Sequence, residues 1–174
     1  MIWIGISGGW RKTNSEIENL VRQTVREIIL RGDGIVSGGA LGVDSFALDE
    51  ALKNNPTADQ IRIFLPASLK DYAIHYRKRA DEGVITKDQA ENLIVQLTSL
   101  KQINPSALIE NPNNSIMNKE TYYNRNSEIV KASDELIAFQ IKSEASEGLG
   151  TGDTIEKARQ KGIPVKFYKF DLSK

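Results

Sequence analysis

Short apolar runs alternate along the chain with longer segments in which apolar residues recur every three or four positions. The short runs predict β-strands, and the first three are followed by glycine or proline, which favour turns. The predicted strands cover residues 2–6, 35–36, 61–65, 135–140 and 164–168. Because helical segments separate these strands, the pattern is typical of an α/β fold with a parallel sheet.

The longer segments have the 3.6-residue periodicity of amphipathic helices. In the first of them, Ile17, Val21 and Val25 fall on one face, which we expect to be buried. Thr86 and Gln89 have the spacing of a capping box, a pair of side chains that bond backbone N–H groups at a helix start. The predicted helices cover residues 14–31, 42–53, 68–80, 86–100, 119–131 and 151–161.

These elements predict one Rossmann-like domain over residues 1–174, with a mainly parallel five-stranded sheet between two layers of helices. Right-handed crossovers, with a reversal of direction after the third strand, give the strand order 3-2-1-4-5. In such folds ligands bind at the carboxyl ends of the strands where the order reverses, here between strands 1 and 4. We also expect a helical and loop insertion at about residues 81–115, which is a lid, an interface or a decoration of the fold.

The charge balance and the missing residue types narrow the chemistry. The 23 basic and 23 acidic side chains give a formal net charge of +0, whereas a dedicated DNA-binding domain usually has a positive excess. The chain has no cysteine, which excludes disulfides, thiolate metal ligands and a cysteine nucleophile. Since His75 is the one histidine, we expect no metal and no cofactor. We expect no signal peptide, no membrane span and a cytoplasmic location.

Three glycine-containing turns, at residues 7–9, 37–42 and 148–152, lie between a predicted strand and a predicted helix. Glycine allows close backbone approach, and the N-terminus of a helix favours an anion. Since parallel strands end at the same edge, the turns predict a phosphate or nucleotide site, although Thr151 and Thr154 are equally suited to capping the helix. The residues expected to hold phosphate and ribose are Ser7, Gly8, Gly9, Ser37, Gly38, Gly39, Gly150, Thr151 and Thr154.

Three segments resemble motifs of the DprA/Smf family. Residues 37–44, SGGALGVD, are similar to its SGxAxGxD motif, and Arg125-Asn126, followed by Ser133-Asp134, is similar to its RNxxIxxxSD segment. Residues 150–165 resemble its closing glycine turn, helix and strand. Together these motifs are similar to the wider SLOG superfamily, which joins DprA-like and LOG-like proteins, and most of all to its small stand-alone nucleotide-binding members.

The resemblance implies a nucleotide or another phosphate-bearing small molecule as the partner, and a homodimer. DprA proteins usually have an arginine in place of Leu41 and a histidine in place of Leu48, so single-stranded DNA is possible but disfavoured as a partner. LOG proteins hydrolyse the bond between a base and ribose 5'-monophosphate, and this chain has Thr154 in place of their glutamate. Catalysis stays open; an enzyme of this kind would be a nucleotide N-glycosidic hydrolase.

Several charged residues have two interpretations. Asp44 either interacts with a helix N-terminus or, by the resemblance, contacts a ribose hydroxyl. Arg125 is either a solvated surface residue or binds phosphate, for which its planar guanidinium is suited. Asp153 and Glu156 are either partners of the helix dipole or, with Asp44, candidate catalytic acids. Asn126 is expected to anchor loops by hydrogen bonds.

Aromatic and basic residues near the predicted rim are also ambiguous. Residues 75–79, HYRKR, follow the third strand and form either a solvated helix face or a contact for a phosphate or a nucleic-acid backbone. Trp10 follows the first glycine turn, where it either stacks on a base or covers the core.

Overall fold

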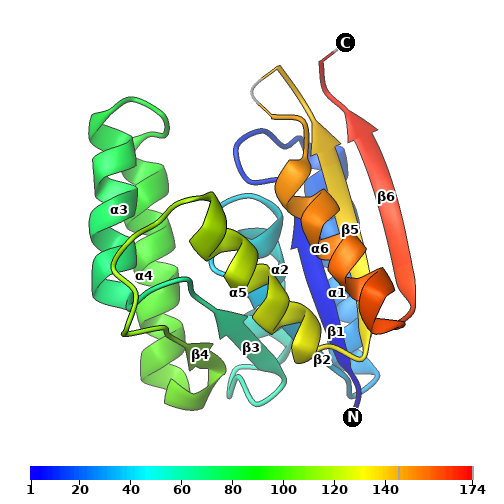
Figure 1. Ribbon diagram of the computed structural model, residues 1–174. Helices are drawn as coiled ribbons and strands as arrows, with labels where there is room; N and C mark the ends of the chain where they lie inside the picture. The colour runs from blue at the N-terminus through cyan, green and yellow to red at the C-terminus, as the bar shows by residue number, and fades with distance from the viewer. Residues whose placement is uncertain (145, 174) are drawn as a thin grey trace.

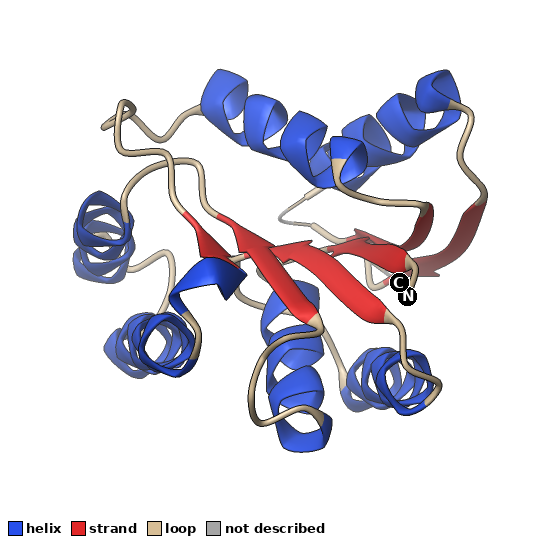
Figure 2. Ribbon diagram, turned by 90° about the horizontal axis from the view of Figure 1, so that it is seen from below, coloured by secondary structure: helices blue, strands red, loops and turns tan. Residues whose placement is uncertain are grey.

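The computed structural model describes residues 1–144 and 146–173 as a parallel sheet between two layers of helices. The strands are β1 (Trp3–Gly8), β2 (Gly34–Gly38), β3 (Ile61–Phe64), β4 (Leu108–Ile109), β5 (Glu135–Lys142) and β6 (Val165–Asp171). The helices are α1 (Ser15–Leu30), α2 (Val43–Asn54), α3 (Leu69–Asp81), α4 (Lys87–Ile103), the 3-10 helix η1 (Pro105–Ala107), α5 (Lys119–Lys131) and α6 (Leu149–Lys161). Figure 1 shows their arrangement. Helices α5 and α6 cover one face of the sheet, and α1, α2 and α4 the other, with α3 against α4 (Figure 2).

The α/β class and the parallel sheet are confirmed, but the prediction of five strands is wrong. The sheet has six strands in the order β4-β3-β2-β1-β5-β6. Five of them keep the predicted order, and the additional strand β4 pairs with the edge of β3 through Ile63↔Leu108 and Phe64↔Ile109. A strand of two residues is too short to show any periodicity, so the sequence predicts only a loop there.

Side chains at the helix starts explain where these elements begin. The Asn14 side chain accepts a hydrogen bond from the Ile17 N–H at 2.9 Å and caps α1. The capping box of Thr86 and Gln89 is present at the start of α4, as predicted. Helix α6 begins two residues earlier than predicted, directly after Gly148. Among the described helices, none combines the length and the apolar character needed to cross a bilayer.

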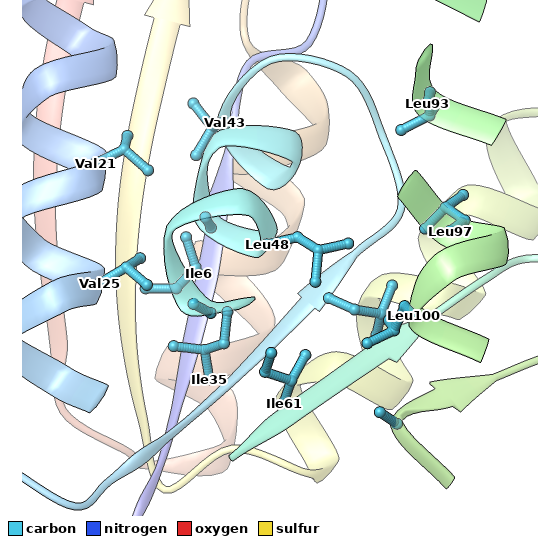
Figure 3. Packing of buried hydrophobic residues seen from close by; sticks show 14 of the residues in the cluster. Ile6, Val21, Val25, Ile35, Val43, Leu48, Ile61, Leu93, Leu97 and Leu100 are labelled. Carbon is cyan, nitrogen blue, oxygen red and sulfur yellow. The ribbon is translucent and has the colours of Figure 1, made fainter. Parts of the chain in front are cut away.

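The main hydrophobic core lies between the sheet and the layer of α1, α2 and α4 (Figure 3). Helix α4 lies within residues 81–115 and adds Leu93, Leu97 and Leu100 to this core, each at most 2% exposed. Burial of a leucine contributes about 1.5–3 kcal/mol. That residues 81–115 are an insertion stays a prediction, and α4 within them is part of the helical layer on this face of the sheet.

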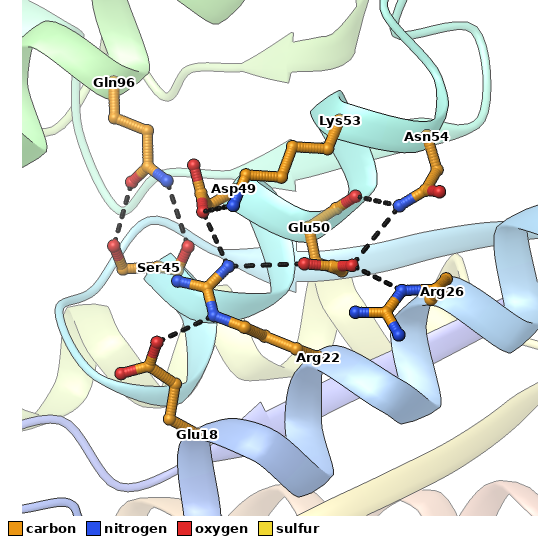
Figure 4. Close-up of polar contacts among 9 residues, drawn as sticks. All are labelled: Glu18, Arg22, Arg26, Ser45, Asp49, Glu50, Lys53, Asn54 and Gln96. Atoms are coloured by element: carbon orange, nitrogen blue, oxygen red, sulfur yellow. Dashed lines mark hydrogen bonds and ion pairs between the residues drawn. The ribbon is translucent and has the colours of Figure 1, made fainter. Parts of the chain in front are cut away.

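A polar network on the outer side of the same layer holds α1 against α2 (Figure 4). The buried carboxylate of Glu50 accepts hydrogen bonds from Arg26 at 2.8 Å and from Arg22 at 3.4 Å. Arg22 also contacts Asp49 at 2.6 Å. Since Glu50 is on α2 and the arginines are on α1, the network fixes how the two helices sit side by side.

Candidate ligand-binding site

A pocket of about 240 Å³ opens at the carboxyl edge of the sheet, where β1 and β5 are neighbours. The strand order reverses between these two strands, so the pocket lies at the predicted switch point. The turn after β1, the start of α2 and the start of α6 contribute backbone and side chains, while α3 and α5 contribute side chains. The predicted site residues that line it are Ser7, Gly8, Gly9, Asp44, Arg125, Gly150 and Thr151.

Close backbone packing shapes the turn after β1. The Val43 N–H donates to the Gly9 carbonyl at 3.1 Å, which attaches this turn to the start of α2. A Cβ on Gly8 would lie 2.5 Å from Val43 Cγ2, and a Cβ on Gly42, at φ +75°, would meet the Gly9 carbonyl. Glycine is therefore required on both sides of this contact, and the backbone of residues 7–9 is held against the pocket.

The N-terminus of α6 faces the same space. Gly148, at φ +74°, ends the preceding loop, and Gly148, Gly150 and Thr151 all line the pocket. The helical hydrogen bonds begin with Gly152 N–H, which donates to Gly148 O at 3.0 Å. The N–H groups before it have no partner within the helix and carry the positive end of its dipole. This end of the pocket therefore suits an anion.

Ser37, Gly39 and Thr154 lie behind the pocket wall. Ser37 and Thr154 are fully buried, and a Cβ on Gly39 would meet the side chain of Leu65 in the core. The Thr154 hydroxyl donates to the Gly150 carbonyl at 3.1 Å, within its own helix. Their placement thus differs from the direct ligand contact predicted for them, because these residues support the wall instead of lining it.

Gly38, which also does not line the pocket, makes room for two charged side chains that do. A Cβ on Gly38 would lie 2.7 Å from Asp44 Oδ2 and would overlap the guanidinium of Arg125. Arg125 donates from Nη1 to the Phe64 carbonyl at 3.4 Å and from Nε to Asn126 Oδ1 at 3.3 Å. A guanidinium has five N–H donors, so further donors of Arg125 can reach a ligand.

Asp44 is a buried acid in the pocket wall, with 7% of its surface exposed. Its Oδ1 lies 3.1 Å from Ser37 Oγ, and its Oδ2 accepts from the Ala40 N–H at 3.3 Å. Burial raises the pKa of Asp44 above its ordinary value, although the charge of Arg125 and these hydrogen bonds act in the opposite direction. An acid with a raised pKa beside an arginine in a pocket is typical of functional sites.

The other two candidate acids do not line the pocket. Asp153 accepts from Lys157 Nζ at 2.6 Å and from Asn126 Nδ2 at 3.3 Å, and Glu156 is exposed. Both acids were expected in the first turn of this helix. Because α6 begins at Leu149, neither of them lies there. Asn126 also donates to the Gly150 carbonyl at 3.3 Å, which joins α5 to the start of α6 as expected of an anchoring residue.

Aromatic and basic side chains form part of the pocket wall. Burial raises the pKa of both Tyr76 and Tyr122, which are therefore neutral near pH 7. Burial and the nearby charge of Arg79 lower the pKa of His75, so this ring is neutral as well. Trp10 packs against the core and also lines the pocket, and its stacking on a base stays a prediction. The aromatic and basic residues of this wall are Trp10, His75, Tyr76, Arg79, Tyr122 and Tyr123.

The basic run at residues 75–79 divides between pocket and solvent. His75 and Arg79 line the pocket, whereas Arg77 forms an ion pair with Glu91 at 2.8 Å. Tyr122 and Tyr123 had no separate signal in the sequence. Tyr122 precedes Arg125 by three positions on a predicted helix, a spacing that places both on one face, so the match at Arg125 indicates it indirectly.

The pocket therefore combines a positive backbone end, a flat aromatic wall and one buried acid beside an arginine. Such a site can hold an anionic group at one end and a ring at the other. Within residues 1–144 and 146–173, no three histidine, aspartate or glutamate side chains are placed to hold a metal ion.

Residues 4–173 match the sequence profile of DNA recombination-mediator protein A. No curated protein matches the sequence. Among solved structures, DNA processing protein A from Helicobacter pylori, which binds single-stranded DNA, is 22% identical with a TM-score of 0.66. The match covers 95% of this chain and 64% of that protein.

Two further structures share the fold. DNA processing protein A (DprA) from Streptococcus pneumoniae is 16% identical with a TM-score of 0.61, over 95% of this chain and 50% of that one. The molybdenum cofactor binding protein from Rippkaea orientalis is 19% identical with a TM-score of 0.59, over 98% of this chain and 78% of that one. This chain thus spans less than two thirds of the length of either DNA processing protein A.

Proposed function

The chain belongs to the DNA recombination-mediator protein A family, as the resemblance to DprA predicted, and from this premise we propose that it binds a small phosphate-bearing ligand of the nucleotide class. The observation that carries the proposal is the meeting of two phosphate-compatible groups in one pocket, the N-terminus of α6 and the guanidinium of Arg125. Ser7 and Gly8, at the end of β1, and Gly9 line the same pocket.

The shape of the pocket supports a small ligand with a ring. Its volume of about 240 Å³ is below the roughly 300–1,000 Å³ of most small-molecule sites, so a long ligand would have to extend out of it. Tyr122, Tyr76 and Trp10 also line the pocket and give it aromatic surface. A nucleoside monophosphate, with its phosphate at α6 and its base toward these rings, meets both requirements.

Isothermal titration calorimetry with AMP tests this proposal. We expect wild-type protein to bind AMP and the Gly150→Glu variant to bind it at least about tenfold more weakly, because a carboxylate then occupies the anion site. A Cβ at Gly150 has no atom within 4 Å, and an acid suits a helix N-terminus, so the variant should fold. Gln160→Glu adds the same charge at the exposed far end of α6 and should not change binding. Equal AMP affinity in wild type and Gly150→Glu would refute the site.

A second candidate function, hydrolysis of a nucleotide N-glycosidic bond, is favoured by Asp44. A general acid needs a pKa above that of an ordinary carboxyl; burial raises the pKa of Asp44, and Asp44 is the candidate acid that lines the pocket. The protein would be incubated with AMP and with NAD, and free base would be measured by chromatography. Release of base by wild type but not by Asp44→Asn would support hydrolysis. No release by the folded wild type would exclude it for these substrates.

Family membership also favours single-stranded DNA as a ligand, as in the Helicobacter pylori relative. Arg79 supplies a positive charge at the pocket. Lys119 and Lys157 lie 5.3 and 5.2 Å from the ring centre of Tyr123, which also lines the pocket. Cations beside an aromatic ring are suited to a phosphate backbone and a base. Fluorescence anisotropy with oligo(dT) should then show binding that weakens steeply between 50 and 200 mM salt. Arg79→Gln should weaken it more than Arg77→Gln, because Arg79 lines the pocket and lies as far as 3.7 Å from its partner Glu82, whereas Arg77 is held by Glu91 at 2.8 Å. Equal effects would argue against this pocket as the DNA site.

The homodimer implied by the resemblance and the cytoplasmic location remain predictions. Sedimentation velocity of the purified protein, with and without AMP, measures the oligomeric state.

A further inference from the structure

A second and larger cavity, of about 590 Å³, lies outside the proposed nucleotide site. It is found at the carboxyl ends of β3 and β4, where Phe64 and Ile109 line it, and α5 forms one of its sides. The carboxyl edge is the side of a parallel sheet on which ligands bind. Arg125 borders this cavity as well as the first pocket, so it stands between the two.

The outer wall of this cavity, residues 110–118, is braced by hydrogen bonds. The side chain of Asn114 donates to the Pro66 carbonyl at 2.6 Å and to the Ile116 carbonyl at 2.9 Å. The Asn111 N–H donates to the Ala67 carbonyl at 3.1 Å. Because both segments of the chain are joined in this way, the cavity is formed before any ligand enters.

The cavity differs from the first pocket in charge. Its polar lining consists mainly of asparagine amides and of the carboxylates of Glu110, Glu120 and Glu128. Among the described lining residues, Arg125 is the single cation. Glu110 is paired with Lys101 at 2.9 Å and Glu128 with Lys131 at 3.0 Å, so the lining is close to neutral as a whole. Such a lining has no excess of positive charge for a phosphate group, and the ligand of this cavity is therefore not the anion of the first pocket.

The remaining chemistry fits a nucleobase. Asparagine amides and glutamate carboxylates bond to the edges of bases, for example to the amino groups of adenine and cytosine. The side chains of Phe64, Pro66 and Ile109 give the cavity apolar surface on which a flat ring can pack. Asn111 and Asn124 lie on opposite sides of the lining, in the wall segment and in α5, and both are exposed enough to reach a ligand.

We propose that this cavity is a second binding site, which takes an uncharged nucleobase or nucleoside through the amides of Asn111 and Asn124. The proposal does not depend on the nucleotide assigned to the first pocket, because the two sites differ in charge and in lining.

Saturation-transfer NMR with adenosine and with cytidine tests the second site. We expect transfer from wild-type protein to both nucleosides, and a reduction by at least half in Asn111→Ala and in Asn124→Ala. Both side chains are exposed, so these variants should fold. Asn113→Ala is the matched control, since Asn113 is exposed in the same loop and does not line the cavity. Gly150→Glu should keep the nucleoside signal while losing AMP.

Three results would overturn the proposal. These are no transfer to either nucleoside, transfer that is unchanged in both Asn111→Ala and Asn124→Ala, and transfer that is lost in Gly150→Glu. The last result would assign the nucleoside to the first pocket. In contrast, failure of AMP to bind, with nucleoside transfer retained, would remove the proposed function and leave the second site standing.

Discussion

Gly38 and Gly39 are neighbours at the end of β2, and their replacement by alanine should have opposite consequences. A methyl group on Gly39 points into the core, where it would overlap the side chain of Leu65 and lie 3.3 Å from Leu97 Cδ2. A methyl group on Gly38 points the other way, into the space that the Arg125 guanidinium occupies beside Asp44. One substitution therefore strains the packing of the fold, and the other displaces a side chain of the site.

The expected loss of stability is larger for Gly39→Ala. An additional methyl group in a closely packed core costs about 1–3 kcal/mol, since Leu65 and Leu97 are buried and have little room to move. For a domain of this size each kcal/mol lowers Tm by roughly 2–4 °C, so we expect a decrease of roughly 2–12 °C. AMP binding by the folded fraction should stay close to that of wild type, because Gly39 does not line the pocket.

Gly38→Ala should instead reduce binding. The methyl group overlaps the guanidinium of Arg125, whose flexible side chain can move away, and it also lies 2.7 Å from Oδ2 of the buried Asp44. Some stability is therefore lost as well, and the guanidinium leaves its place at the pocket. A charge-assisted hydrogen bond contributes about 1.5–3 kcal/mol, so its loss corresponds to a decrease in AMP affinity of roughly 10- to 150-fold. Arg125→Gln, which removes the charge directly, should give a decrease of similar size.

Thermal unfolding and calorimetry with AMP on the same preparations separate the two effects. The expected result is a lower Tm with retained affinity for Gly39→Ala, and a lower affinity with a smaller decrease in Tm for Gly38→Ala. If both variants lose affinity to the same extent while remaining folded, both glycines contact the ligand and the placement of Gly39 behind the wall is wrong. If neither variant changes affinity, Arg125 does not bind the phosphate.

Three further predictions concern single side chains and use thermal unfolding as the measurement. Burial raises the pKa of Asp44, so ionisation of this carboxyl opposes folding as the pH rises through that pKa. The Asp44→Asn variant should therefore melt no lower than wild type at pH 7. The advantage of the variant should disappear as the pH approaches about 3.9. Burial acts to raise the pKa of Glu50, but the hydrogen bonds and charges of Arg26 and Arg22 outweigh burial, so the pKa is lowered. Glu50→Gln should therefore be less stable than wild type by about 1–2 kcal/mol at pH 7. This difference should shrink below about pH 4.3. Thr86→Ala removes the capping box of α4 and should cost about 1 kcal/mol, or roughly 2–4 °C in Tm; an unchanged Tm would contradict a role of this cap in the fold.

Most of the fold could be predicted from the sequence because its long elements carry strong periodic signals. The order of five strands follows from alternating strands and helices together with right-handed crossovers. The strand β4 could not be predicted, because its two residues are fixed by pairing with β3 and not by their own pattern. The packing of α4 into the core could not be predicted for a related reason. The apolar face of this helix indicates that it is buried but does not indicate the element against which it packs.

The candidate site was predictable in position but not in composition. The glycine turns locate the carboxyl edge, yet the sequence does not show which glycines face a ligand and which face the core. Gly8 and Gly9 line the pocket, whereas Gly39 contacts Leu65. That distinction depends on the segments that pack above each turn, and those are distant in the sequence. Tyr122 and Tyr123 were missed for the same reason, since α3 and α5 meet at the pocket only in the folded chain.

At two positions, Leu41 and Leu48, the chain has a leucine where DprA proteins usually have an arginine or a histidine, so the positive charges at the site come from other residues. Leu48 is 1% exposed, and Leu41 packs partly buried against the same core, so both side chains contribute to packing and not to ligand binding. The cations at the pocket come from other elements, with Arg79 on α3 and Arg125 on α5. A phosphate here would therefore lie between the α6 N-terminus and the side of α3 and α5, away from the turn after β2. Because the net charge of the chain is +0 and these cations are gathered at one pocket, the arrangement favours a compact anion over a long strand.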